Sequence, residues 1–223
     1  MIMESNLAIL GLTLRVGLLS TLLCLPFAIC IGYGLARQAL PFPSLLRAVI
    51  SLPMVMPPVA VGLALLWLFG ATSPLAPLWS SLGIDLAFTP GAAVVAAAVV
   101  GFPLLARSAE QSFTGIDIRY EEIARTLGAS RLETFARVSL PLARRGLLYG
   151  SLLCFTRALG EFGATAVIAG IIPGRTETLS LGIWSRIQLG DDTGAFTLVA
   201  LSFGLALASM IAAERWLGPG RRS

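Results

Sequence analysis

Long stretches without a charged residue dominate the hydropathy pattern of this chain. Four of them cover residues 16–36, 48–84, 86–106 and 193–213, and a fifth, residues 146–170, is interrupted only by Arg157 and Glu161. Each is long enough to supply the roughly 20 apolar residues that cross a bilayer as a helix. The pattern predicts about five transmembrane helices. Residues 71–88 and 171–192 then form longer surface or re-entrant connections, the second with an amphipathic half-helix around residues 178–189.

The composition supports the same class. Hydrophobic residues make up 56% of the chain and charged residues 13%, and the mean hydropathy is +0.85, which is far from the balance of a soluble domain. We therefore expect an all-α integral membrane protein with one membrane domain over residues 1–223. Its first span is too long for a cleavable signal peptide and lacks a basic start.

Arginine supplies all 16 basic residues, and its distribution orients the chain. With five spans, twelve arginines fall on one side, namely Arg37, Arg47, Arg107, Arg119, Arg125, Arg131, Arg137, Arg144, Arg145, Arg215, Arg221 and Arg222. The other side holds only Arg15, Arg175 and Arg186. Arginine-rich loops stay in the cytoplasm, so we expect an inner-membrane protein with its amino terminus outside and its carboxyl terminus and residues 107–145 inside. The basic pI reflects this topology, and we expect no nucleic-acid partner.

Several chemistries lack their residues here. The chain has no His, which excludes a His-based zinc site and a Ser-His-Asp triad. It has no Lys either, so it contains no Walker A loop. Cys24, Cys30 and Cys154 have no metal-ligand spacing and are expected to be packing residues. We expect no catalytic residue, metal or cofactor, and energy for uphill transport must come from another chain or from an ion gradient.

The charged island from residue 117 to 141 predicts two helices joined by an elbow. Asp117 is the expected N-cap of the first helix, and Gly128 ends it. Ser130 and Glu133 form a capping box that starts the second helix, which Pro141 ends by forcing Leu140 out of helical geometry. The expected apolar positions are Tyr120, Ile123, Ala124 and Leu127 on the first helix, and Leu132, Phe135, Ala136 and Val138 on the inner side of the second. Periodicity alone leaves two roles open, a docking element or a loop on membrane lipid with its arginines among the headgroups.

The second span contains Pro53, Pro57 and Pro58, which remove backbone donors and predict a kink. Freed carbonyls in a membrane need protein or a water-filled cavity around them. The kink and the nearby Gly62 are therefore candidates for the translocation path or its gate, and better helix packing is the alternative. Gly146 and Gly150, at G-x-x-x-G spacing, are expected to serve close helix packing.

Arg157 and Glu161 are the only ionisable residues well inside a predicted span. Four residues apart, they share a helix face and can neutralise each other. A lone charge at bilayer depth costs at least about 2.5–3.5 kcal/mol, so we expect an ion pair. It either fixes the rotation of the helix or lines the path.

The island also matches a known motif. Glu122-Ile123-Ala124, three residues, Gly128, nine residues and Val138-Ser139-Leu140-Pro141 resemble the E-A-A-x3-G-x9-I-x-L-P loop of bacterial ABC importer permeases, with Ile123 for Ala and Val138 for Ile. The resemblance implies a type I-like permease whose cytoplasmic coupling loop, residues 107–145, inserts in a cleft of a separate ATP-binding subunit. The implied coupling residues are Glu122, Ile123, Ala124, Gly128, Leu140 and Pro141.

Three further stretches, residues 52–62, 157–165 and 172–179, are similar to those of molybdate permease subunits. That resemblance implies a homodimeric molybdate importer, fed by a periplasmic binding protein and driven by an ATPase partner, and not an enzyme in itself. Import of sulfate, thiosulfate or tungstate is the alternative within the family. A stand-alone gradient-driven carrier or channel is the alternative from another class, and it would be expected to carry more buried ionisable residues.

Overall fold

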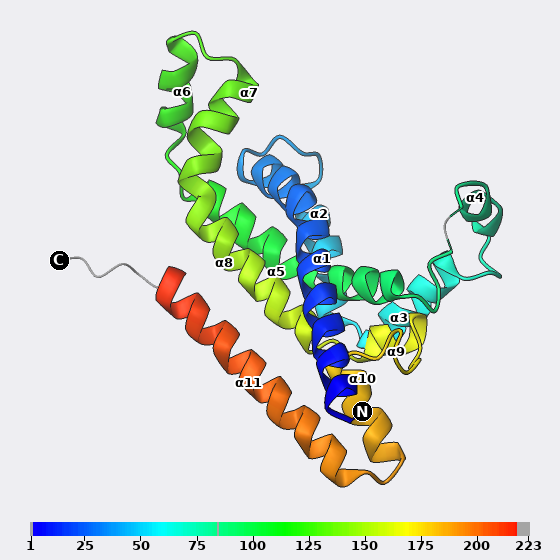
Figure 1. Cartoon of the computed structure of the whole chain (residues 1–223). Helices are drawn as coiled ribbons and strands as arrows, with labels where there is room; N and C mark the ends of the chain where they lie inside the picture. The colour runs from blue at the N-terminus through cyan, green and yellow to red at the C-terminus, as the bar shows by residue number, and fades with distance from the viewer. Residues whose placement is uncertain (1, 84, 218–223) are drawn as a thin grey trace.

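The structure is a computed structural model that describes residues 2–83 and 85–217 (Figure 1). All regular elements in this part of the chain are helices. They are α1 (Ile2–Ala36), α2 (Pro43–Val55), α3 (Pro58–Phe69), α4 (Ala76–Ser81), α5 (Pro90–Thr114), α6 (Ile118–Thr126), α7 (Arg131–Thr134), the π-helical turn η1 (Phe135–Ser139), α8 (Leu140–Leu159), α9 (Gly163–Ile168), α10 (Leu179–Gln188) and α11 (Asp192–Leu217). The all-helical prediction is confirmed.

The helices α1, α5 and α8 pack against one another and form the centre of the molecule. Small residues set their spacing, because they let helix backbones approach closely. A Cβ at Gly32 would lie 2.7 Å from Cβ of Ala109, and one at Gly150 would lie 2.6 Å from Cβ of Ser108. Ser108 also donates a hydrogen bond of 2.8 Å to the carbonyl of Gly146. The predicted packing role of Gly146 and Gly150 is confirmed.

The predicted kink in the second span is a sharp bend. The chain bends by 109° between the axes of α2 and α3. The break falls at Met56 and Pro57. Two successive prolines explain it, since Pro57 and Pro58 donate no backbone hydrogen bond and Pro58 opens the new helix. Pro53 differs from its prediction, because α2 continues past it to Val55.

The fourth predicted span is also interrupted. The helix α8 ends at Leu159, and the short α9 begins at Gly163. Three described helices are long and apolar enough to cross a membrane, α1, α5 and α11, and the bent α2–α3 pair makes a fourth if it counts as one span. The helix α8 carries Arg144, Arg145 and Arg157, which explains why it falls outside this set.

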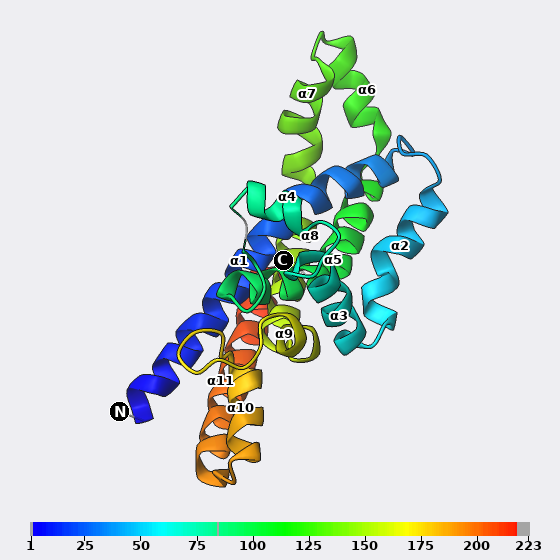
Figure 2. The ribbon, with the colours of Figure 1, turned by 90° about the vertical axis from the view of Figure 1, so that its right-hand side faces the viewer.

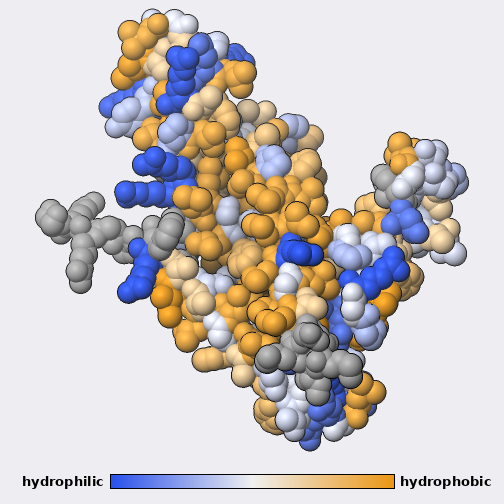
Figure 3. Space-filling model, viewed as in Figure 1, coloured by the Kyte–Doolittle hydropathy of each residue, from blue (hydrophilic) through white to orange (hydrophobic). Residues whose placement is uncertain are grey.

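The helices α10 and α11 form a hairpin along the flank of the molecule (Figure 2). The expected half-helix at residues 178–189 is confirmed as α10. Much of α11 is exposed, including Phe196, Phe203 and Leu207, and apolar residues cover the middle of the face in Figure 3. A surface of this kind suits contact with lipid.

Two ends of the molecule are distinguished from here on. The helices α6 and α7 project at one end, which we term the loop end, and the start of α1 lies with α10 at the other, the far end (Figure 1).

Candidate functional site

The first helix of the island is built as its sequence predicts. A side-chain oxygen of Asp117 accepts a hydrogen bond of 3.0 Å from the backbone N–H of Arg119 and caps α6. At the other end of α6, the backbone N–H of Ala129 donates a hydrogen bond to the carbonyl of Ala124, and the backbone N–H of Gly128 donates one to the carbonyl of Arg125. This pair of bonds is a Schellman motif, which needs a residue in the left-handed region after the helix. Gly128 supplies it with φ of 94°.

The second helix starts as predicted but does not end as predicted. Ser130 and Glu133 form both bonds of the capping box, of 3.0 and 3.2 Å, and these bonds, with the charge of Arg137, lower the pKa of Glu133. The prediction that Pro141 ends the helix is wrong, because Leu140 is helical and α8 continues to Leu159. The π turn η1 explains the difference. Its wider turn, closed by the N–H of Leu140 on the carbonyl of Phe135, brings the chain into α8, where Pro141 occupies the first turn.

The loop presents large apolar side chains to solvent. Tyr120, Ile123, Leu127 and Leu132 are all exposed, Leu127 by 82% and Leu132 by 75%. The prediction that Leu132 and Ala136 face inward is wrong, because both are exposed. Leu132 lies on α7 and Ala136 on η1, in the segment that projects beyond the packed helices. Glu122 is exposed beside these residues and lines an open hollow with Arg125, Ser130 and Arg131. Exposed apolar groups rimmed by charges mark a surface for a protein partner or a membrane.

Glu121, which directly precedes the exposed Glu122 in the sequence, is buried. Arg37 donates to it from Nε at 3.0 Å and from a terminal nitrogen at 2.7 Å. Ser139 donates at 2.7 Å and the hydroxyl of Tyr33 at 3.1 Å. We term these four residues the Glu121 cluster. It joins the end of α1, the helix α6 and the π turn at one point.

Electrostatics favour the charged form of Glu121. Burial raises the pKa of this carboxyl, but hydrogen bonds from Arg37 and Ser139, the charge of Arg37 and the bond from Tyr33 outweigh burial and lower the pKa overall. A lowered pKa stabilises the fold above the ordinary pKa of a glutamate, and the contribution is lost as the pH falls through the folded value. Glu121 is thus ionised at neutral pH, and removing one partner of such a buried pair costs about 3–5 kcal/mol.

The sequence pattern does not single out Glu121, because its partners Arg37 and Tyr33 lie more than eighty residues away. One signal was present. Of two successive glutamates on a short amphipathic helix, only one can share the exposed face with Ile123. Aromatic packing supports the cluster, as the ring of Tyr33 meets Phe113 at 5.3 Å and Phe135 at 5.0 Å between centroids.

A second candidate site lies at the break between α8 and α9. The predicted ion pair of Arg157 and Glu161 is present at 2.8 Å, with side chains 34% and 2% exposed. Glu161 lies past the end of α8 and also accepts a bond of 2.9 Å from the N–H of Ala164. Its carbonyl accepts a bond of 2.6 Å from Ser180. The carboxylate therefore neutralises Arg157 and caps the start of α9 at the same time.

The two helix breaks meet. A Cβ at Gly62 would lie 2.7 Å from the carbonyl oxygen of Ala164, and one at Gly163 would lie 2.9 Å from Cβ of Pro58. The helix that follows the prolines, α3, therefore packs directly on the helix that follows Glu161. Of the predicted path residues, Pro58, Gly62 and Glu161 come together here, and Arg157 joins them through its ion pair with Glu161. Pro53 lies apart, within α2. Broken helices that meet in a membrane domain are typical of substrate sites in transporters.

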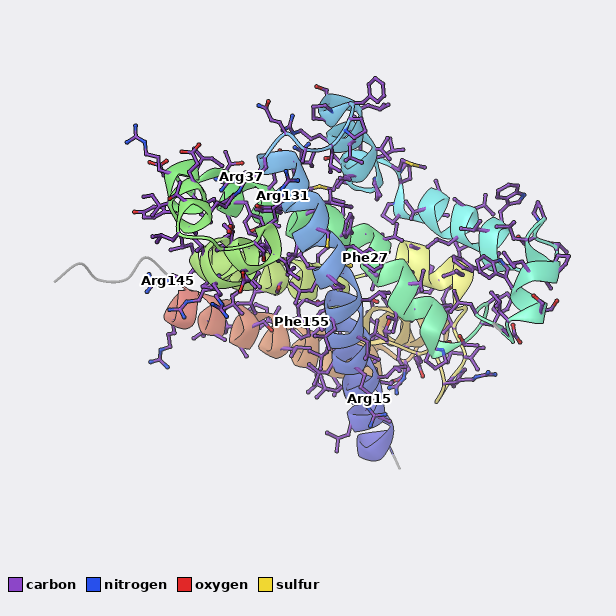
Figure 4. The ribbon with its side chains drawn as sticks, turned by 90° about the horizontal axis from the view of Figure 1, so that it is seen from above. Arg15, Phe27, Arg37, Arg131, Arg145 and Phe155 are labelled. Carbon is purple, nitrogen blue, oxygen red and sulfur yellow. The ribbon has the colours of Figure 1, made fainter. Side chains whose placement is uncertain are left out.

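A groove of about 870 Å³ lies along the first half of α1. One wall is α1 from Leu7 to Leu19, and the others are the start of α5 and residues 174–177. We term it the α1–α5 groove. Arg15 and Arg175 line it, together with the buried Glu177. No described acidic side chain lies within salt-bridge distance of Arg15, which lies on α1 far from Arg37 (Figure 4).

The fold and these sites define a helical membrane protein with two discontinuous helices that meet and an exposed loop of apolar and charged residues at one end. The family described as "Binding-protein-dependent transport system inner membrane component" matches residues 28–223. The chain belongs to this family of multi-pass inner-membrane transport components.

Individual relatives agree. Over 208 residues the chain is 41% identical to the molybdenum transport system permease protein ModB of Escherichia coli (strain K12), covering 92% of this chain and 90% of that protein. It is 36% identical to the sulfate transport system permease protein CysW of Synechococcus elongatus, over 90% of this chain and 70% of that protein. Among solved structures, the MetNI methionine ABC transporter in inward facing conformations superimposes with a TM-score of 0.66 at 18% identity, covering 97% and 94% of the two chains. That likeness concerns the fold.

Proposed function

We propose that this chain is the permease subunit of an ATP-driven molybdate importer. The observation that carries the substrate is the 41% identity to a molybdenum permease over nearly the whole of both chains. The lower similarity to a sulfate permease keeps sulfate as the second candidate. Selection between tetrahedral dianions then rests mainly with a periplasmic binding protein that delivers the anion.

The coupling loop, residues 107–145, is the proposed dock for a cytoplasmic ATP-binding subunit. The exposed apolar residues Ile123 and Leu127 would enter a cleft of that subunit, with Glu122 beside them at the rim. A few side chains that fill well-packed pockets carry most of the binding energy at such interfaces. Gly128, Leu140 and Pro141 act from within, by shaping the elbow and the entry into α8.

The translocation path is proposed to run past the meeting point of the two helix breaks. One copy has too few helices to enclose a conduit and shield it from lipid, so the working unit is a homodimer with one coupling loop per ATPase copy. The α1–α5 groove, with Arg15 and Arg175, faces the outside and receives the anion. ATP-driven movement of the loops then exchanges an inward for an outward opening.

The decisive experiment is uptake by the complex of this chain, its ATPase and its binding protein in proteoliposomes. We expect molybdate uptake that requires ATP, with tungstate competing well and sulfate poorly. Preferential sulfate uptake would select the second candidate. Uptake that needs an ion gradient and no ATPase would instead identify a stand-alone carrier.

The proposed orientation places the coupling loop in the cytoplasm and the α10–α11 turn outside. In a chain without Cys24, Cys30 and Cys154, we expect Leu127→Cys to react with an impermeant maleimide only from the cytoplasmic face. Leu189→Cys, similarly exposed at 78%, should react only from the periplasm. Labelling of intact cells at the first position and not at the second would reverse the orientation.

The bend at Met56 and Pro57 is proposed to shape the path. Replacing Pro57 and Pro58 together by Ala restores two backbone donors and favours one continuous helix. We expect uptake to fall by about tenfold or more, at a cost of only about 1–3 kcal/mol in stability. The ATPase should remain bound. Uptake at the level of the parent, measured beside the surface control Pro77→Ala, would assign the bend to packing alone.

A further inference from the structure

The Glu121 cluster is the only described side-chain contact between α6 and α1 that involves an ion pair. The chain links the coupling loop directly to α5 and to α8, because α6 follows α5 and η1 runs into α8. It gives no such link to α1, whose end at Ala36 lies more than eighty residues before Glu121. The cluster therefore provides a direct polar link between α6 and the end of α1.

The helix α1 is continuous from Ile2 to Ala36 and connects the two ends of the molecule. Arg37, at its loop end, contacts Glu121 and also donates to the carbonyl of Ile116 at 3.4 Å. About 30 Å away along the axis, at about 1.5 Å per residue, the same helix forms a wall of the α1–α5 groove. Figure 4 shows Arg37 and Arg15 on opposite parts of this one helix.

The hydrogen bonds of the Glu121 cluster form a strong connection between α6 and α1. Four hydrogen bonds converge on one carboxylate, two of them from a guanidinium, and hydrogen bonds to charged groups are the strong ones. The exposed Glu122 next to it makes no salt bridge with a described residue. The two glutamates of the motif thus have different surroundings, and only Glu121 is fixed to the membrane helices.

We infer that Glu121 is a positioning residue for transport: it fastens the coupling helix to α1, so that movement of α6 is carried along α1 and changes the opening of the α1–α5 groove at the far end. Glu121 acts on transport through α1, with no contact to the anion. This inference rests on the proposed function, because it needs an ATPase that moves α6. The alternative is that α1 follows α5 and α8 through helix packing and does not depend on the cluster.

The test uses the full complex in nanodiscs and a reporter cysteine at Leu19, an exposed residue of the groove wall. In the parent chain we expect its rate of maleimide labelling to change several-fold when a non-hydrolysable ATP analogue closes the ATPase. In Glu121→Gln we expect that change to disappear, with uptake reduced by about five- to hundredfold and ATP hydrolysis retained. Arg37→Gln should behave in the same way, and Tyr33→Phe, which keeps its ring packing, should lose only part of the response.

The matched control is Arg47→Gln, which lies outside the coupling loop and removes a similarly short ion pair, 2.6 Å from Glu110, that links α2 with α5. It should keep both the labelling response and uptake. The reversed pair, Arg37→Glu with Glu121→Arg, should regain part of the response, which separates transmission from a loss of folding.

A nucleotide response in Glu121→Gln and Arg37→Gln equal to that of the parent would overturn the inference, as would an equal loss in the Arg47→Gln control. Failure of the proposed function looks different. In that case the parent chain itself shows no nucleotide response and no ATP-dependent uptake.

Discussion

Gly128→Val should leave the chain in the membrane at a near-normal level and abolish most of the ATP-driven uptake. Gly128 has φ of 94°, a conformation that a β-branched residue adopts only at a cost of about 1–3 kcal/mol. A Cβ there meets no atom within 4 Å, so the effect is backbone strain and not crowding. We expect the Schellman motif to open and the elbow to change direction, which moves the apolar docking residues relative to α8. The measurement is uptake together with ATPase retained on purification, and we expect uptake to fall by about tenfold or more.

A second test variant and a control variant accompany this prediction. Glu122→Arg reverses the charge at the edge of the docking surface without touching the elbow, and it should weaken ATPase binding. Gly83→Val is the control for strain, because Gly83 also has positive φ, 66°, and no neighbour for a Cβ, but follows α4 outside the loop. If Gly128→Val and Glu122→Arg bind the ATPase and import molybdate as well as the Gly83→Val control, the coupling role of the loop is wrong.

Glu161→Gln should lower the maximal rate of uptake by about tenfold and lower the KM for molybdate as well. The amide keeps the size of the side chain and its ability to cap α9, but it leaves Arg157 with an unneutralised charge near the proposed path. A dianion then binds more tightly and leaves more slowly, because release is a separate requirement of conduction. Initial rates of uptake over a range of molybdate concentrations would measure both quantities.

The paired variant Arg157→Gln with Glu161→Gln removes both charges. It should recover part of the rate but raise the KM, since the anion loses its cationic partner. A purely structural ion pair gives another result: reduced protein level, and a KM that neither variant changes. That outcome would remove Arg157 and Glu161 from the path.

The sequence predicts some parts of this molecule well and others poorly, and the difference follows the range of the interactions. Asp117, Gly128 and the capping box of Ser130 and Glu133 act within a few residues, so their pattern is readable directly. The Arg157–Glu161 pair is equally local, at a spacing of four residues, although Glu161 lies past the end of α8. The Glu121 cluster needs residues from α1, and no local pattern connects them.

The misassigned positions have physical causes of the same kind. Pro141 is read as a helix end because the rule for proline assumes an α-helical register, and a π turn before it changes that register. The break after Leu159 was concealed by the apolar composition of residues 146–170, although Gly160 and Gly163 on either side of Glu161 were present as a signal. For Leu132 the pattern predicts an inward side chain, because amphipathicity alone does not distinguish a face that meets its own protein from one that is left exposed.

The projection of α6 and α7 beyond the packed helices has an evolutionary meaning. The surface proposed to recognise the motor subunit is carried by one short segment between two framework helices, and the residues around the helix breaks lie elsewhere in the chain. Mutations can therefore change the choice of motor without changing the cargo, and the reverse. If this segment were exchanged between permeases, it would fit the new membrane helices only if it kept a carboxylate at the position of Glu121 to pair with the arginine at the end of α1. Glu121 therefore marks the boundary of this evolutionary module.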